Sequence, residues 1–286
     1  LFYSPQTGQP DTAQHLSRFV YDDVKDTLVM DSEKVLLRVP VKRDGCCHTG
    51  GSIAWDKSGN LFLSTGDDTN PFDSNGYGPM DNRPGRAGWD ARATSSNTND
   101  LRGKILRIKP TPEGGYTIPE GNLYPAGIYH AKPEIYVMGN RNPYRISVDK
   151  RTGFLYWGEV GPDASVDGPR GPRGYDEFNQ AKGPGFFGWP YFIGNNQAYA
   201  DVNFETMAIG SKFNPAAPIN ESPNNTGLRE LPAATKAMIW YPYGTSEEFP
   251  LVGSSGRSAT GGPVFRKDDF ATDKRAFPSY YEGKWL

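Results

Sequence analysis

The chain has 286 residues, a formal net charge of −2 and a pI near 6.0, with 36% hydrophobic residues, 34 glycines and 25 prolines. This composition is typical of a turn-rich globular protein that is large enough to bury a full core. A near-neutral charge without a basic stripe argues against nucleic-acid binding. No apolar run reaches the roughly 20 residues that span a bilayer, so we do not expect a membrane-embedded segment.

The first 41 residues predict β-strands. Apolar or alternating runs occupy residues 1–4, 16–21 and 34–41, separated by segments that carry Asp, Gly and Pro. Nowhere does the sequence show a convincing apolar period of 3.6 residues, so we expect an all-β fold. His15 has no acidic or cysteine neighbour at ligand spacing, and we expect it at the surface.

Residues 46–67 combine a candidate base with a signature of the fold. Apolar residues alternate with smaller or polar ones in 53–55 and again in 61–63, and the segment between them, 56–60, has turn chemistry. This pattern predicts a β-hairpin with His48 on the loop before its first strand.

The only two cysteines, Cys46 and Cys47, are adjacent. A vicinal pair forms either a strained disulfide ring or two reduced thiols in a tight corner. Both alternatives stay open, and the pair alone does not indicate a cellular compartment.

The hairpin pattern recurs at residues 144–159, where two alternating strands flank an Asp-Lys turn that contains glycine. Arg141 and Asn142 precede this second hairpin as His48 precedes the first. Two copies indicate a repeat architecture, and in a propeller such corners converge on one central pocket.

Two long polar segments, 67–100 and 197–232, interrupt the strand pattern, and we interpret them as insertions. A structureless loop this long is usually functional or mobile. Asp67 and Asp68 suggest a metal site, but their spacing is not that of an EF-hand, and we favour a solvated turn.

Strands are predicted again at 101–110, 237–241 and 262–266, and residues 284–286 are also strand-like. Because both ends of the sequence look like strands, we expect an internal piece of a longer protein, whose start could carry a secretory signal. The sequence has no G-x-S-x-G elbow, P-loop, H-E-x-x-H or C-x-x-C motif, so hydrolase, NTPase and zinc-protease functions lose their usual support.

An ordered set of short motifs resembles the glucose/sorbosone dehydrogenase family. The set comprises Cys47-His48, Gly-Asn-Arg-Asn-Pro at 139–143, Gly-Glu-Val-Gly-Pro-Asp at 158–163, Asp176-Glu177 and Gly-Trp-Pro at 188–190. Members are soluble six-bladed β-propellers that use pyrroloquinoline quinone (PQQ) and calcium to oxidise sugars. The resemblance implies that residues 1–286 are an incomplete piece of one propeller domain. It is nearest to the secreted bacterial branch, which implies a periplasmic or secreted location.

The resemblance also implies catalytic roles. His48 matches the general base that takes the proton of the sugar C1 hydroxyl while hydride passes to the quinone, a task that suits imidazole. Arg141 and Asn142 match residues that contact the quinone, and the Arg141 guanidinium would stabilise the developing oxyanion.

The resemblance also implies which residues bind calcium. Gly161 and Pro162 match the backbone carbonyls that hold the cofactor's calcium, and Glu177 matches a ligand of a second, structural calcium. Cys47 stands where the best-studied glucose oxidisers have an acid. The family's upstream glutamine and downstream Lys and Arg residues of the quinone pocket would fall outside residues 1–286, and the 67–100 insertion could cover the pocket mouth.

The leading hypothesis is therefore a PQQ- and calcium-dependent dehydrogenase that acts on the C1 hydroxyl of an aldose or oligosaccharide. Its further partners would be an electron acceptor, such as a cytochrome or dye, and other domains of a longer chain. The main alternative is a non-catalytic carbohydrate-binding or scaffold propeller within a larger secreted protein. A calcium-dependent sugar lactonase would need several carboxylate ligands, which the Gly161-Pro162 pair does not supply.

Overall fold

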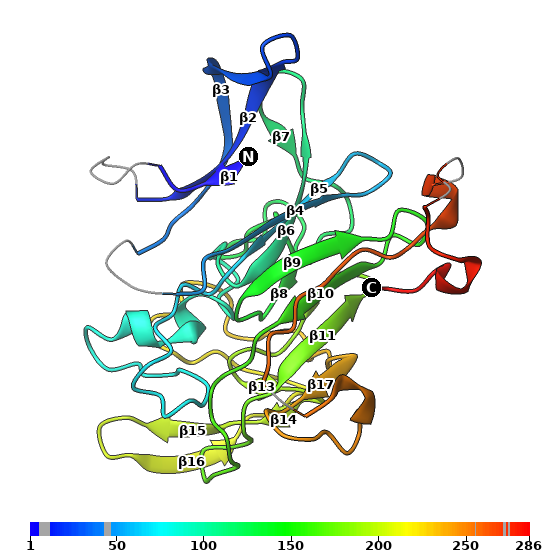
Figure 1. Cartoon of the computed structure of the whole chain (residues 1–286). Helices are drawn as coiled ribbons and strands as arrows, with labels where there is room; N and C mark the ends of the chain where they lie inside the picture. Colours follow the sequence, from blue (N-terminus) through cyan, green and yellow to red (C-terminus); the bar gives the residue numbers. More distant parts are fainter. Residues whose placement is uncertain (6–11, 43–46, 255, 271–272, 274) are drawn as a thin grey trace.

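The structure, a computed structural model, describes residues 1–5, 12–42, 47–254, 256–270, 273 and 275–286. Within these residues the chain forms strands and five short 3-10 segments and contains no α-helix, which confirms the all-β prediction (Figure 1). None of the helical segments found there has the length and apolar character that crossing a bilayer requires.

The first predicted hairpin lies in a sheet whose strands run in the order β12-β8-β6-β5-β4, with β7 paired to β6. The hairpin is confirmed, because Ile53 pairs with Leu63 and Trp55 with Leu61. Only the β12–β8 pairing is parallel, so β4, β5, β6 and β8 form a four-stranded antiparallel unit. The strands are β4 (Gly50–Trp55), β5 (Leu61–Thr65), β6 (Lys104–Pro110), β7 (Tyr116–Thr117), β8 (Ile135–Met138) and β12 (Gly185–Phe186).

The second predicted hairpin opens another four-stranded antiparallel sheet, in the order β17-β11-β10-β9. Its strands are β9 (Pro143–Val148), β10 (Leu155–Glu159), β11 (Asp176–Ala181) and β17 (Ile239–Tyr241). Each hairpin thus begins a four-stranded unit, as the repeat predicted and as in a propeller blade. The two units lie side by side in Figure 1.

The remaining strands form three smaller sheets. The N-terminal sheet has the order β1-β2-β3, and two hairpins pair β13 with β14 and β15 with β16. The strands are β1 (Phe2–Tyr3), β2 (Gln14–Asp22), β3 (Thr27–Val39), β13 (Phe192–Ile193), β14 (Gln197–Ala198), β15 (Ala200–Asn203) and β16 (Ala208–Lys212). The 3-10 segments are η1 (Ala87–Trp89), η2 (Ala91–Ala93), η3 (Pro250–Val252), η4 (Lys267–Phe270) and η5 (Ser279–Tyr281).

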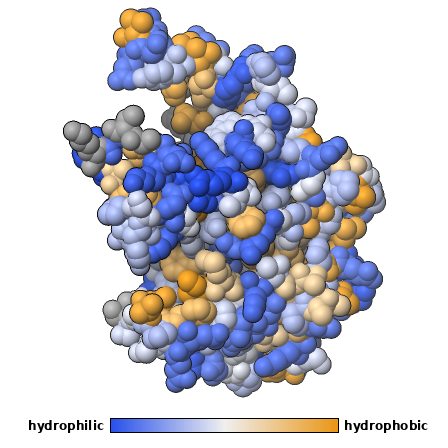
Figure 2. Space-filling model, turned by 90° about the vertical axis from the view of Figure 1, so that its right-hand side faces the viewer, coloured by the Kyte–Doolittle hydropathy of each residue, from blue (hydrophilic) through white to orange (hydrophobic). Residues whose placement is uncertain are grey.

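A buried apolar cluster joins the two four-stranded units. Phe62, Ile105 and Val137 from the first unit pack with Leu155 and Trp157 from the second. Burial of such side chains is the main force that holds neighbouring blades together. On the face shown in Figure 2, hydrophilic and hydrophobic residues are interspersed, and no single apolar area covers it.

Three predictions about secondary structure and exposure are wrong. Residues 262–266 and 284–286 form no strand and share only an isolated bridge between Val264 and Trp285, in a stretch where Pro263 lacks the amide that a strand ladder needs. His15 is 8% exposed because β1 covers this part of β2, and its ring packs against that of Tyr3.

The two predicted insertions are also more ordered than expected. The 67–100 segment contains η1 and η2, and its residues 94–98 are buried. The 197–232 segment contains β14, β15 and β16. A segment with few apolar residues acquires this order through hydrogen bonds to distant parts of the chain, which local pattern does not reveal. The choice between a disulfide and two reduced thiols at Cys46 and Cys47 involves Cys46, which lies outside the described residues.

Candidate active site

His48 lies just before β4, and its side chain is held by an acid that follows β5. Its Nδ1 is 2.8 Å from Oδ1 of Asp67, and the other carboxylate oxygen of Asp67 accepts a hydrogen bond of 2.7 Å from the indole nitrogen of Trp189. Because an ionised carboxylate only accepts hydrogen bonds, Nδ1 carries the proton and Nε2 is the basic nitrogen of the ring. The arrangement suits a general base.

Asp67 and Asp68 are not a solvated turn, and that prediction is wrong. Asp67 has no exposed surface and Asp68 is 6% exposed. Asp68 accepts hydrogen bonds from the backbone of Lys42 and from the guanidinium of Arg102, although burial still raises its pKa. Their partners come from distant segments, which explains why adjacent sequence alone suggested a solvent-exposed turn.

The second polar corner meets the first directly. The backbone N–H of Asp67 donates to the carbonyl of Arg141 at 2.8 Å. A Cβ on Gly66 would lie 1.8 Å from the carbonyl oxygen of His48 and 2.7 Å from Oδ1 of Asn142, so only glycine fits between the two corners. The structure therefore brings His48, Arg141 and Asn142 together.

Arg141 is almost fully buried, at 7% exposure. Its Nη1 donates to the carbonyl of Val160 at 2.9 Å, and its guanidinium lies 5.9 Å from the ring centre of Trp189. The carboxylate of Glu159 accepts the backbone N–H groups of both Arg141 and Asn142. Glu159 thus fixes the backbone of this corner, a role that the sequence analysis did not assign.

Glu177 pairs with Glu159 across β10 and β11, and both side chains are buried. Burial raises the pKa of both carboxyls, and for Glu159 the neighbouring charge of Glu177 adds to the effect. Glu177 accepts hydrogen bonds from the backbone of Gly194 at 2.6 Å and from the side chain of Asn179 at 3.1 Å. No group of three or more His, Cys, Asp or Glu side chains able to hold a metal occurs among the described residues.

Gly161 and Pro162 lie beside a cation that the sequence analysis missed. Gly161 N–H donates to Oδ1 of Asp176 at 2.9 Å, and the carbonyl of Pro162 accepts a hydrogen bond of 2.8 Å from Nη2 of Arg257. The Arg257 side chain has no exposed surface. A calcium ion at the Pro162 oxygen would meet this fixed positive charge, so the residues present do not fit calcium at this corner while Arg257 stays in place.

The buried positive charge of Arg141 favours an anionic group over a divalent cation at this corner. PQQ is a flat aromatic tricarboxylate, and the buried guanidinium of Arg141 beside the indole of Trp189 supplies a positive charge and an aromatic face. Oδ1 of Asn142 is buried and has no hydrogen-bond partner within the described part of the chain. An unpaired buried polar atom of this kind is expected at a ligand site.

The 67–100 segment covers this corner. Pro71, Ser74, Gly76, Tyr77 and Pro79 line a small cavity, and its other walls are formed by Arg141, Pro162, Asp163 and Trp189. Hydrogen bonds to the loop that follows β10 hold the segment in place. Ala164 N–H donates to the carbonyl of Gly76 at 2.9 Å, Tyr77 OH donates to the carbonyl of Val166 at 3.1 Å, and the Arg170 guanidinium donates to the carbonyls of Ser74 and Gly78. The segment therefore forms one wall of the candidate site.

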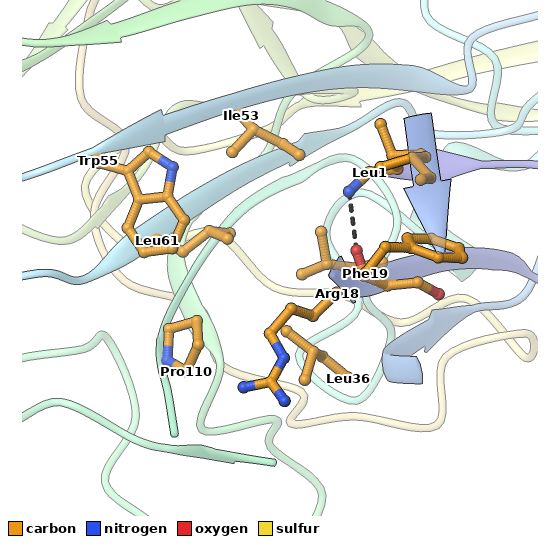
Figure 3. A pocket seen from close by; sticks show the side chains of 11 residues that line it. Leu1, Arg18, Phe19, Leu36, Ile53, Trp55, Leu61 and Pro110 are labelled. Carbon is orange, nitrogen blue, oxygen red and sulfur yellow. Dashed lines mark hydrogen bonds between the residues drawn. The ribbon is translucent and has the colours of Figure 1, made fainter. Parts of the chain in front are cut away.

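A separate apolar hollow lies between the N-terminal sheet and the β4–β5 hairpin (Figure 3). Leu1, Phe19 and Leu36 face Ile53 and Trp55 across it, and the terminal amine of Leu1 donates to the carbonyl of Ser17. None of the candidate catalytic or cofactor residues lines this hollow. Its mainly apolar lining offers no acid–base chemistry, so it is not the candidate active site.

Comparisons with known proteins agree with the sequence resemblance. The HIPL2 protein of Arabidopsis thaliana is 28% identical over 158 residues, which are 51% of this chain and 19% of that protein. Aldose sugar dehydrogenase YliI of Escherichia coli (strain K12) is 26% identical over 185 residues, 64% of this chain and 38% of that protein. The chain thus spans well under half the length of these curated relatives.

Among solved structures, the PQQ-bound form of aldose sugar dehydrogenase from Streptomyces coelicolor is 24% identical, with a TM-score of 0.42. The match covers 67% of this chain and 47% of that one. The family model described as Glucose / Sorbosone dehydrogenase matches residues 1–217. Because that match covers well over half of the chain, the protein belongs to the glucose/sorbosone dehydrogenase family.

Proposed function

We propose that the protein to which this chain belongs is a PQQ-dependent dehydrogenase that oxidises the C1 hydroxyl of an aldose or oligosaccharide. The observation that carries the proposal is the contact between the His48 corner and the Arg141 corner through Asp67. A base, its orienting acid and a buried cation lie together at the ends of separate strands, as a propeller site requires.

His48, Asp67 and Arg141 have separate roles in the proposed reaction. Nε2 of His48 takes the proton of the C1 hydroxyl, while Asp67 holds the ring and stabilises the imidazolium that forms. The C1–H bond breaks as the C1=O bond forms, which gives a lactone from a cyclic sugar. PQQ, when bound, supplies the two-electron oxidant that accepts the hydride. Arg141 provides positive charge where negative charge develops.

The other parts of the proposal depend on the family resemblance. An electron acceptor, such as a cytochrome or dye, would reoxidise the quinone, and the protein would act in the periplasm or outside the cell as part of a longer chain. The calcium requirement expected at Gly161, Pro162 and Glu177 has the least geometric support, because Arg257 contacts the Pro162 oxygen and Glu177 is satisfied by Gly194 and Asn179.

The test is a titration of the full-length apo-protein with PQQ, with and without calcium, followed by absorbance during addition of a panel of aldoses. Stoichiometric binding and sugar-dependent reduction of the quinone would support the proposal. No binding at micromolar quinone would instead favour the non-catalytic carbohydrate-binding or scaffold propeller. The lactonase alternative is weaker still, since the described residues contain no cluster of carboxylate ligands.

A further inference from the structure

Arg257 is a buried cation whose position the family resemblance does not explain. Its Nη2 donates a hydrogen bond of 2.8 Å to the carbonyl of Pro162, and its guanidinium lies 3.7 Å from the ring centre of Tyr243. The side chain has no exposed surface. A fully buried guanidinium carries a large desolvation cost, so its partners must stabilise a positive charge at this point.

The partners belong to the corner that matches the family's calcium carbonyls. Nε of Arg257 lies 3.6 Å from Oδ1 of Asp176, an acid that also accepts the backbone N–H groups of Gly161 and Ala259. The Asp176 carboxylate therefore binds the backbone of Gly161 directly and lies next to Arg257. Arg257 in turn donates to the carbonyl of Pro162. The contacts of Asp176 and Arg257 thus hold both Gly161 and Pro162 in position.

The space around the Pro162 oxygen is already filled. A Cβ on Gly174 would lie 1.6 Å from that oxygen and 2.9 Å from Nη1 of Arg257, so the backbone of Gly174 closes one side and the guanidinium closes another. A divalent ion bound at the Pro162 oxygen would have to displace Arg257 or accept its repulsion at short range.

We propose that the guanidinium of Arg257 is the resident cation of the Gly161–Pro162 corner and takes the place that calcium has in the resembled family. Its Nε and Nη1, which have no hydrogen-bond partner within the described residues, leave donors for a carboxylate or quinone oxygen of a bound cofactor. This last step rests on the proposed function, whereas the filling of the corner does not. Quinone binding would then be independent of calcium at this corner.

The experiment compares full-length wild type with Arg257→Met. Melting temperatures are measured in EDTA and in saturating calcium, without cofactor. We expect calcium to raise the melting temperature of Arg257→Met by about 3 °C more than that of wild type, because removal of the guanidinium opens a carbonyl site. Arg173→Met is the matched control, since it removes a guanidinium that is paired with Asp167 at the surface, and its calcium response should equal that of wild type.

PQQ affinity of the apo-protein gives a second readout. In EDTA, Arg257→Met should bind PQQ about tenfold more weakly than wild type, and calcium should restore its affinity. The inference would be overturned if calcium raised the melting temperatures of wild type and Arg257→Met by the same amount. It would also be overturned if EDTA weakened PQQ binding by wild type as much as PQQ binding by Arg257→Met.

Two further outcomes are also decisive. If Arg257→Met does not fold, Arg257→Lys keeps a cation at the corner and should respond to calcium as wild type does, and a larger response would contradict the inference. If wild type binds no PQQ under either condition, the proposed function fails, while the melting temperatures still decide whether Arg257 occupies the corner.

Discussion

The carboxylate of Asp67 accepts a hydrogen bond of 2.7 Å from the indole nitrogen of Trp189, 122 positions away in the sequence. The same carboxylate holds Nδ1 of His48. Trp189 also lies beside the Arg141 guanidinium, so one acid and one indole connect the candidate base with the residue proposed to stabilise the developing negative charge. This connection exists only in the folded chain, and substitutions within it should separate catalysis from cofactor binding.

Asp67→Asn should lower kcat of the full-length enzyme by about tenfold or more while PQQ affinity changes little, because an amide no longer holds the basic tautomer of His48. The measurement is steady-state kinetics with an aldose, together with a PQQ titration. Asp68→Asn is the matched control, because Asp68 contacts Lys42 and Arg102 and not the imidazole. Equal kcat values for Asp67→Asn and wild type would remove Asp67 from the mechanism.

His48→Ala should lower turnover by a factor of about 100 or more and leave PQQ binding nearly intact, since the base acts on the substrate proton. Single-turnover reduction of bound quinone by an aldose measures this step directly. His130→Ala provides a control, because the His130 side chain is exposed and packs edge-on against Tyr129, which belongs to neither corner. An unchanged rate in His48→Ala would require another base.

Local sequence pattern predicted the elements that local interactions determine. The period-two alternation around Ile53 and Leu63, and around Ile146 and Trp157, predicted both hairpins, because successive side chains of a strand point to opposite faces of the sheet. The hydrogen bond from Asp67 to Arg141 places the end of the first hairpin against the corner that precedes the second.

Residues whose environment is set by distant segments could not be predicted in this way. Asp67 looked solvated because its partner Trp189 is 122 positions away. Arg257 was missed because Pro162, which accepts its hydrogen bond, is 95 positions away and nothing adjacent marks it as buried. For both, burial and charge depend on tertiary packing, which a single sequence specifies but does not display locally.

Asp149, in the turn of the second hairpin, should stabilise the fold in a pH-dependent manner. Its carboxylate accepts a hydrogen bond of 3.1 Å from Nε of Arg266, and the hydrogen bonds from the Arg266 guanidinium lower its pKa to about 2. The folded pKa lies below that of the unfolded chain, so the unfolded state binds more protons as pH falls below about 4. The stabilisation, about 2 kcal/mol, is therefore complete near neutral pH and is lost as pH falls towards 2.

Urea unfolding of wild type and Asp149→Asn at several pH values measures this effect. The difference between the two should be greatest near pH 7 and should shrink below pH 4. Asp268→Asn removes a solvent-exposed partner of Arg151 and should change the free energy of unfolding by about 0.5 kcal/mol or less. A stability difference for Asp149→Asn that does not depend on pH would contradict the assigned ion pair.

Lys104 should be essential for holding the 67–100 segment on the sheet. Its side chain is completely buried in β6, and its ammonium donates to the carbonyls of Thr94, Ser95 and Arg102 at 2.7, 2.9 and 2.7 Å. Three donors meeting three carbonyls satisfy the ammonium fully, whereas a thioether donates to none of them and would leave the Arg102 carbonyl without a partner among the described residues. Lys104→Met should therefore lower the free energy of unfolding by about 3 kcal/mol.

Lys109→Met, at an exposed position of the same strand, should change stability by less than about 0.5 kcal/mol. Because residues 71–79 form a wall of the candidate site, loosening their segment in Lys104→Met should also raise KM for the sugar more than it lowers kcat. Limited proteolysis should then cut within 67–100 before the strands. Wild-type stability and wild-type KM in Lys104→Met would show that other contacts hold this wall in place.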